Sequence, residues 1–429
     1  MVKLSSLIIL LYLSSVFNCC FAQNTIGPIF SCKKKLQDQY GICTHISRKA
    51  PRYEFNFRDT DLSMIKSIGA TYIRTDCDWE PLKTGKNDVL NFHDYDSVVM
   101  SVKRHKIGML GIFTIDNRNY VTEDWRNFIS MTARRYKREI RYWEILNESD
   151  LIYRYVDGFN MNNYASFLRN GFNAIKKENK KAKVLFSGLA NISSNAIDTV
   201  LNLDVASYFD IMNIHVYTWK NWEPEDFIYN YQRLNVVMQK YNLCDKHLWV
   251  TETGCQNNLG EEGSRLTDIR LPRIFLISFA MGVDKVFWYK SRSCELDPNY
   301  NEDHFGLWHK DFVPKPAFYS YQTLIRMCPS RSTRPQLKKY DNVYMASWKR
   351  PDGKKVWALW TSKGDDTISL KIKGHYEVYD HHGEVKSDKI PCELKITPYV
   401  LYVIGAKDIE IEDRVSQDNY KKKEECGLE

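Results

Sequence analysis

The sequence predicts an α/β fold, a (β/α)8 or TIM barrel followed by a small antiparallel β-sandwich. From about residue 40 to residue 328, short β-branched or aromatic runs alternate with stretches of helical periodicity, as in βα units around a parallel sheet. After Pro329 the apolar residues recur at period two, and no convincing helix separates the runs. An open doubly wound sheet is the rival topology, but no Gly-rich fingerprint follows the first run.

Each element follows from its local pattern. Eight runs are expected to form the barrel strands: 40–46, 71–79, 107–115, 140–147, 183–189, 209–217, 247–253 and 284–289. The stretch 163–178 is typical of the intervening helices, because lysines follow it and its apolar residues share one face: Tyr164, Phe167, Leu168, Phe172 and Ile175. Five later runs are expected to form the sandwich: 343–348, 356–360, 367–372, 376–379 and 394–404.

Composition fits a large barrel domain with a smaller partner. The 429 residues are 43% apolar and 27% charged, which allows a large core and excludes a disordered or fibrous chain. The net charge of +8 comes from scattered lysines, many at predicted helix ends, and therefore predicts no nucleic-acid partner. The sequence leaves the oligomeric state open.

The N-terminus has the features of a signal peptide over residues 1–22. Lys3 provides the positive charge, residues 7–17 form a short apolar core, and Ala22 precedes the expected cleavage site. A lipid anchor on Cys19 or Cys20 is a less favoured alternative, because Phe17 and Asn18 are poor neighbours for a lipidation signal. No other stretch is apolar enough to span a membrane, so we expect a soluble protein that is secreted or periplasmic.

The expected domains are a barrel over residues 23–328, a sandwich over 329–410 and a charged tail over 411–429. The connection after Cys328 is too short and charged to be a long tether, so the sandwich is expected to pack on the barrel. The segment 24–39 could reach the sandwich and tie the two together. Three aromatic residues of the sandwich could serve either packing or sugar binding: Trp348, Trp357 and Trp360.

The cysteines beyond the signal peptide are odd in number and include no CxxC pair: Cys32, Cys43, Cys77, Cys244, Cys255, Cys294, Cys328, Cys392 and Cys426. This pattern argues against zinc, and no metal or other cofactor is expected. One or two disulfides would suit an oxidising compartment, but isolated core cysteines are the preferred interpretation.

Two predicted strands, the fourth and the seventh, end in carboxylates. The fourth ends in Asn147 and Glu148, and the seventh places Glu252 alone at its C-terminal end. Polar groups at that end of a barrel strand point to the active-site face. Asn-Glu after one strand is more often a capping or loop pair, but two carboxylates across one barrel mouth can face each other over a sugar.

These two motifs, W-E-I-L-N-E at 143–148 and T-E-T-G at 251–254, resemble those of the clan A superfamily of retaining glycoside hydrolases. Family 39, which includes β-xylosidases and exopolysaccharide-cleaving endoglycosidases, is most similar, because of His45 after the first strand and Arg74, Asp78 and Trp79 on the second. The resemblance covers residues 40–328, and the sandwich also fits it. Leu146 and Ser149 depart from the Trp and Pro that are common there, which weakens any transfer of substrate preference.

The resemblance implies hydrolysis of an O-glycosidic bond in a polysaccharide or oligosaccharide, with net retention. Glu148 would be the general acid/base and Glu252 the nucleophile, with the two carboxyl groups roughly 5–5.5 Å apart. A noncatalytic carbohydrate-binding protein on the same barrel is the alternative. An inverting hydrolase or lyase is a third, and a spacing of about 6.5 Å or more would favour it.

The resemblance also implies substrate-binding residues. Arg74 and Tyr217 would hold Glu252 ionised, Asn147 would bind the sugar 2-hydroxyl, and His215 would share the face of Tyr217. Trp288 would form the floor on which a sugar stacks. His45, Asp78 and Trp79 could contact the nonreducing sugar, although Asp78 could instead pair with Arg74. Predicted loop residues could add subsites: Asn117, Arg118, Tyr120, Trp219, Trp222 and Trp308.

Overall fold

The computed structural model describes residues 25–49, 52–79, 83–84, 89–115, 118–190, 192, 194–219, 221–255, 260–387 and 393–414. The predicted signal peptide, Asn117, Cys392 and Cys426 lie outside the described residues. Within the described ranges, no helix is long and apolar enough to cross a membrane. The seven described cysteines beyond the signal peptide are free thiols, five of them buried.

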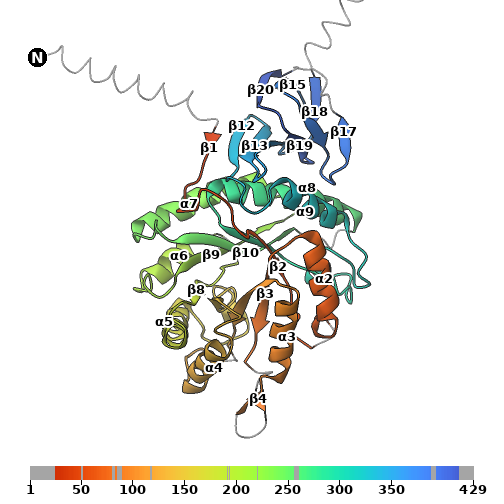
Figure 1. Cartoon of the computed structure of the whole chain (residues 1–429). Helices are drawn as coiled ribbons and strands as arrows, with labels where there is room; N and C mark the ends of the chain where they lie inside the picture. The colour runs from red at the N-terminus through yellow and green to blue at the C-terminus, as the bar shows by residue number, and fades with distance from the viewer. Residues whose placement is uncertain are drawn as a thin grey trace, which may run out of the picture.

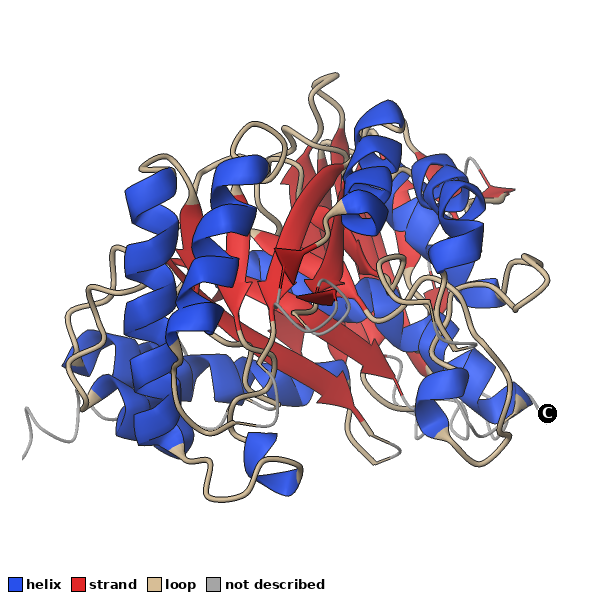
Figure 2. Cartoon of the chain, turned by 90° about the horizontal axis from the view of Figure 1, so that it is seen from below, coloured by secondary structure: helices blue, strands red, loops and turns tan. Residues whose placement is uncertain are grey.

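Eight parallel strands in the described part of the chain close into a barrel, which confirms the predicted fold class. They are β2 (Tyr40–Cys43), β3 (Tyr72–Cys77), β6 (Gly108–Phe113), β7 (Tyr142–Ile145), β8 (Lys183–Leu185), β9 (Ile211–Thr218), β10 (His247–Cys255) and β11 (Lys285–Trp288). Each lies within or beside one of the eight predicted runs. Figure 2 shows these strands in the middle of the molecule with helices around them.

A helix follows every barrel strand: α2 (Arg58–Ile68), α3 (His93–Arg104), α4 (Glu123–Arg135), α5 (Met161–Glu178), α6 (Ser194–Leu201), α7 (Phe227–Lys240), α8 (Glu261–Met281) and α9 (Pro316–Met327). Helix α5 begins at a capping box formed by Asn160 and Asn163. Helices α2 and α8 end at Gly69 and Gly282, whose φ angles of +94° and +108° suit glycine. Local signals therefore set where these helices begin and end.

The C-terminal domain consists of two antiparallel sheets above α8 and α9 (Figure 1). The larger sheet contains β1 (Thr25–Ile26), β12 (Gln336–Tyr340), β13 (Val343–Lys349), β14 (Lys355–Thr361), β19 (Leu401–Ile404), β16 (Glu377–Tyr379) and β17 (Val385–Ser387). The smaller sheet contains β18 (Glu393–Ile396), β15 (Asp366–Lys373) and β20 (Asp408–Arg414). Strand β20 continues past residue 410, so the expected start of the charged tail at 411 is wrong. The N-terminal segment does reach the sandwich, because β1 pairs with β12.

The central strands of the larger sheet, β13 and β14, are buried on both faces. In β13 and β14, Met345 and Trp357 face the smaller sheet, whereas Trp348 and Trp360 belong to the core shared with the barrel. The Trp348 indole N–H donates to the Met327 carbonyl at 2.9 Å, and the Trp360 indole N–H donates to Glu225 at 2.7 Å. These tryptophans are therefore in packing positions, not on a free sugar-binding face.

A chain truncated after Pro329 is expected to express mainly as aggregate, because it would expose the barrel surface that Trp348 and Trp360 cover. Each fully buried aromatic side chain contributes about 1.5–3 kcal/mol. The check is soluble yield and monomer fraction by size-exclusion chromatography, with a chain ending at Arg414 as the control. A truncated barrel as soluble as that control would contradict the prediction.

Candidate active site

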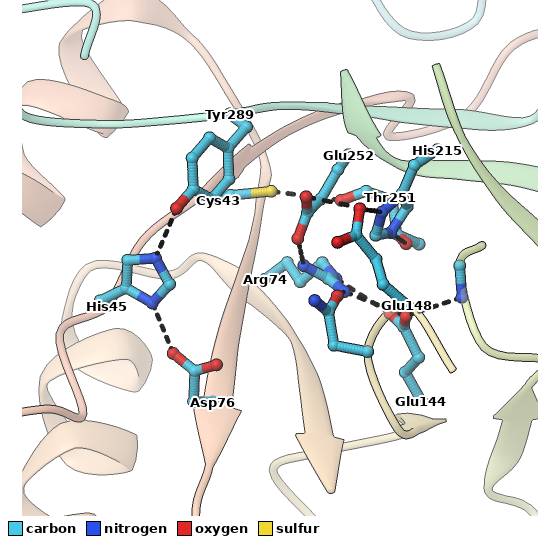
Figure 3. Close-up of polar contacts among 12 residues, drawn as sticks. Cys43, His45, Arg74, Asp76, Glu144, Glu148, His215, Thr251, Glu252 and Tyr289 are labelled. Atoms are coloured by element: carbon cyan, nitrogen blue, oxygen red, sulfur yellow. Dashed lines mark hydrogen bonds and ion pairs between the residues drawn. The ribbon is translucent and has the colours of Figure 1, made fainter. Parts of the chain in front are cut away.

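The C-terminal ends of the barrel strands surround a cavity of about 1090 Å³. It is lined by Glu148 and Asn147 after β7, Glu252 on β10 and Tyr217 on β9. The two glutamate side chains come from opposite parts of the barrel and point toward each other (Figure 3). The sequence thus concentrates its titratable groups at the strand ends, where a substrate can reach them.

An irregular backbone after β7 brings Asn147 and Glu148 to the same cavity. Leu146 and Glu148 have φ angles of 62° and 41°, a left-handed conformation that costs a non-glycine residue about 1–3 kcal/mol. Backbone hydrogen bonds hold it: Leu146 N–H donates to the Phe113 carbonyl and Glu148 N–H to the Gly188 carbonyl, both at 3.0 Å. In a regular strand two successive side chains would point to opposite faces.

Glu252 lies among hydrogen-bond donors. Its side chain is 9% exposed; it accepts from the Arg74 guanidinium and, at 2.7 Å, from the Tyr217 hydroxyl. A register shift between Val250 and Glu252 in the pairing with β9 aims the carboxylate into the cavity. Burial raises the pKa of Glu252, but the His215 and Arg74 charges and the Tyr217 hydroxyl outweigh it and leave the pKa below its usual range.

Glu148 has a different environment. Its side chain is 24% exposed and accepts from His215 Nδ1 at 3.0 Å. Burial and, to a smaller extent, the nearby Glu252 charge raise the pKa of Glu148 above its usual range. The two carboxyl groups are therefore suited to different protonation states at one pH.

His215 bridges the two carboxyl groups. It is fully buried on β9, with Nδ1 also 3.5 Å from Glu252 and Nε2 3.2 Å from the Thr251 hydroxyl. One carboxylate oxygen of Glu148, one ring nitrogen of His215 and one carboxylate oxygen of Glu252 all lie within 4.8 Å of one another. The Arg74 guanidinium already pairs with Glu252, and this fixed positive charge opposes a metal cation at the same place.

Arg74 is itself fixed by Glu144, a residue that sequence reasoning did not select. Glu144 is fully buried on β7 and accepts two hydrogen bonds from Arg74, at 2.9 and 3.0 Å, and one from Gly188 N–H at 3.1 Å. Arg74 also donates to Asn147 Oδ1 at 2.7 Å. The sequence did contain a signal for Glu144, which is a lone Glu within an apolar barrel strand. A carboxylate buried in such a strand requires a cation beside it, here Arg74.

A second cluster of polar side chains lines the other side of the cavity. His45 Nδ1 lies 2.6 Å from Asp76 and its Nε2 lies 3.2 Å from the Tyr289 hydroxyl. Asp78 pairs with Arg48 at 2.6 Å, so the alternative in which Asp78 pairs with Arg74 is wrong. Asp76, Arg48 and Tyr289 line the cavity but were not predicted.

No protein-family model matches the chain, and no curated protein matches it. Among solved structures, a family 39 glycoside hydrolase from Bacteroides cellulosilyticus WH2 aligns with a TM-score of 0.74 at 20% identity, covering 87% of this chain and 81% of that one. The chain shares the fold of family 39 glycoside hydrolases. A β-xylosidase from Caulobacter crescentus CB15 aligns over 87% of this chain and 97% of its own, with a TM-score of 0.65 at 12% identity. A family 51 α-L-arabinofuranosidase from Bifidobacterium longum aligns with a TM-score of 0.60 at 10% identity, covering 89% of this chain and 99% of that one.

Within this family 39 fold, the structure brings most of the predicted site residues to one cavity. Glu148, Asn147, Arg74, Tyr217, Glu252, His45 and Asp78 line it, and His215 lies directly behind the two glutamates. Trp219 also lines it, with 42% of its surface exposed, whereas the described residues Arg118, Tyr120 and Trp222 do not.

Three predicted tryptophan contacts are wrong. Trp288 is fully buried in the core, and its neighbour Tyr289 faces the cavity instead, because successive strand residues face opposite sides. Trp79 is buried and stacks on Phe128 with ring centroids 6.1 Å apart. Trp308 is buried, and its indole N–H donates to Asp61 at 2.9 Å.

Proposed function

We propose that this protein is a retaining glycoside hydrolase that acts by double displacement. The proposal rests on the pair Glu148 and Glu252, which have carboxylate oxygens within 4.8 Å of each other. The pKa of Glu148 is raised and the pKa of Glu252 is lowered. Retaining enzymes use carboxyl groups about 5–5.5 Å apart, whereas inverting enzymes need about 6.5–9.5 Å to admit a water. One oxygen of each carboxyl group lies within 4.8 Å of the other, which leaves little room for a water between them and so supports retention.

In the first step, Glu148 donates its proton to the glycosidic oxygen. The bond from this oxygen to the anomeric carbon breaks while a Glu252 oxygen bonds to that carbon. In the second step, Glu148 takes a proton from water, the water oxygen bonds to the anomeric carbon, and Glu252 leaves as a carboxylate. Asn147, held by Arg74, would bind the sugar 2-hydroxyl.

The proposed substrates are plant or microbial polysaccharides or their oligosaccharide fragments. The cavity of about 1090 Å³ exceeds the ~300–1,000 Å³ typical of pockets for small ligands, and Trp219 and Tyr300 at its rim are partly exposed. A secreted or periplasmic location is part of the proposal and is supported by the signal-peptide pattern of residues 1–22.

The test is a screen against aryl β-xylosides, β-glucosides and α-arabinofuranosides and against polysaccharides, followed by NMR of the first-formed product. Hydrolysis with the anomeric configuration of the substrate is the expected result. A product of inverted configuration would refute double displacement. Sugar binding without turnover on any substrate would favour the noncatalytic alternative.

Tyr217→Phe is expected to lower kcat about 10–100-fold, because it removes a hydrogen bond to an ionised group worth about 1.5–3 kcal/mol. This hydrogen bond favours the ionised form of Glu252, so its loss raises the pKa of Glu252 and moves the acidic limb of kcat/KM to higher pH. The measurement is a pH–rate profile. Tyr231→Phe is the control, because the Tyr231 hydroxyl contacts Ser278 in the buried core. An unmoved acidic limb would contradict the assignment.

Trp219→Ala is expected to raise KM for oligosaccharides about 3–10-fold while leaving hydrolysis of a small aryl glycoside nearly unchanged. An aromatic stacking contact is worth about 0.5–1.5 kcal/mol, and Trp219 lies at the cavity rim. Trp222→Ala is a matched control, since Trp222 has almost the same exposure, 43% against 42%, but does not line the cavity. Equal effects of the two changes would refute a Trp219 subsite.

A further inference from the structure

A second cluster of ligating side chains lies where the sandwich meets the barrel. Asp268 on α8 is within 3.0 Å of His382 Nε2 and 3.3 Å of His381 Nε2, and the donor atoms of all three lie within 4.8 Å of one another. Asp268 belongs to the barrel, whereas both histidines are in the turn between β16 and β17. The cluster therefore joins two domains.

The turn is built so that two successive side chains point the same way. Asp380 Oδ1 accepts the backbone N–H groups of His382, at 3.0 Å, and Glu384, at 2.9 Å. Gly383 follows with a φ of +83°, which suits glycine. In a strand, His381 and His382 would face opposite sides of the sheet, whereas here both rings face Asp268.

Neighbouring side chains fix the orientation of all three groups. The His381 ring packs on Tyr399 with centroids 4.2 Å apart, and the His382 ring packs on Tyr319 at 5.9 Å. The Ser320 hydroxyl donates to Asp268. A hydrogen bond such as that from Ser320 to Asp268 is typical of residues that orient a ligating carboxylate.

We propose that Asp268, His381 and His382 bind one Zn²⁺ ion, with water as a further ligand, and that this ion fastens the sandwich to the barrel. Two imidazole nitrogens and a carboxylate are ligands that Zn²⁺ accepts at about 2.0–2.2 Å, and donor atoms around such an ion lie roughly 3.3 Å apart. His382 Nε2 lies 3.0 Å from Asp268 Oδ1 and His381 Nε2 lies 3.3 Å from Asp268 Oδ2, both close to this spacing, and one ligand atom from each of the three residues lies within 4.8 Å of the others. The His381 and His382 side chains are 20% and 33% exposed, so water and the ion can reach them.

The site is independent of the proposed hydrolase function. It also departs from the expectation of no metal, which rested on the absence of cysteine pairs. That pattern excludes thiolate sites and carries no information about imidazole and carboxylate ligands. The rival description is a hydrogen-bonded cluster of charged groups that needs no ion.

The experiment uses the full chain, stripped with EDTA and then given zinc sulfate at neutral pH. We expect about one zinc per chain after gel filtration and a rise in Tm of a few degrees. His382→Gln is the decisive variant, because the glutamine amide can still donate to Asp268 but ligates zinc poorly. This variant should have the same Tm as metal-free wild type. It should bind no zinc and show no rise in Tm when zinc is added. His381→Gln is a second variant with the same expectation, in case the first fails to fold.

Two controls separate this site from others. Glu148→Gln removes a ligand from the other possible metal-binding cluster, Glu148, His215 and Glu252. This variant should still bind zinc and show the rise in Tm. His309→Gln alters a partly exposed histidine that pairs with Glu295, and this variant should also bind zinc and show the rise in Tm as wild type does. Wild type without bound zinc, or zinc lost in Glu148→Gln but kept in both junction variants, would overturn the proposal.

Discussion

Replacing Glu252 by alanine is expected to lower kcat at least about 10⁴-fold, because it removes the group that bonds to the anomeric carbon. Removal of a nucleophile in other enzymes costs up to about 10⁶-fold. The change also leaves Arg74 with Glu144 as its remaining ion-pair partner, so some loss of stability is expected. Glu252→Gln keeps the shape of the side chain and should be equally inactive with a smaller change in Tm. The measurement is kcat on an activated aryl glycoside together with thermal unfolding.

Glu410→Ala provides the matched control, since Glu410 is a half-exposed carboxylate on β20. It should retain wild-type turnover. Ordinary turnover by folded Glu252→Ala would refute the nucleophile assignment, whatever the behaviour of the other variants.

Replacing Glu148 by alanine is expected to lower the rate about 10²–10⁴-fold on substrates with poor leaving groups, and much less on dinitrophenyl glycosides. A good leaving group needs little proton donation, so the loss should depend on the pKa of the leaving alcohol. Added azide should restore part of the rate, because it attacks the glycosyl-enzyme without a general base. The azide product should keep the anomeric configuration of the substrate.

The measurement is a plot of log kcat/KM against leaving-group pKa for wild type and variant. Asp150→Ala is a useful comparison, since Asp150 is a neighbouring carboxylate that accepts from the Ala190 backbone N–H. An equal loss on every leaving group would show that Glu148 is not the acid.

The sequence predicted the fold well because each βα unit carries its own signal. All eight barrel strands and β13, β14, β15 and β16 of the sandwich arise from the predicted apolar runs. The run 394–404 instead forms two strands, β18 and β19, in different sheets, and β1, β12, β17 and β20 were not predicted. The lengths were less accurate: the run 183–189 forms a strand only over Lys183–Leu185. Strand length depends on pairing with neighbours, which composition does not record.

The site was predicted where a polar residue interrupts an apolar strand, as at Glu148 and Glu252. The contacts of Arg74 with Glu144 and of His45 with Asp76 were missed, because these partners come from other parts of the chain and depend on tertiary placement. Trp288 shows a further limit. Period two places Trp288 and Tyr289 on opposite faces, but the sequence alone does not say which face is the cavity.

The pairing of β1 with β12 imposes an order on the biogenesis of this protein. Thr25 and Ile26 are synthesised before every other described residue, yet their partners Lys338 and Leu337 follow the whole barrel. Such a distant contact forms late, since the entropy of closing the long intervening loop must first be offset. On the growing chain the N-terminal strand therefore remains without its sheet until β12 has been synthesised, after the whole barrel.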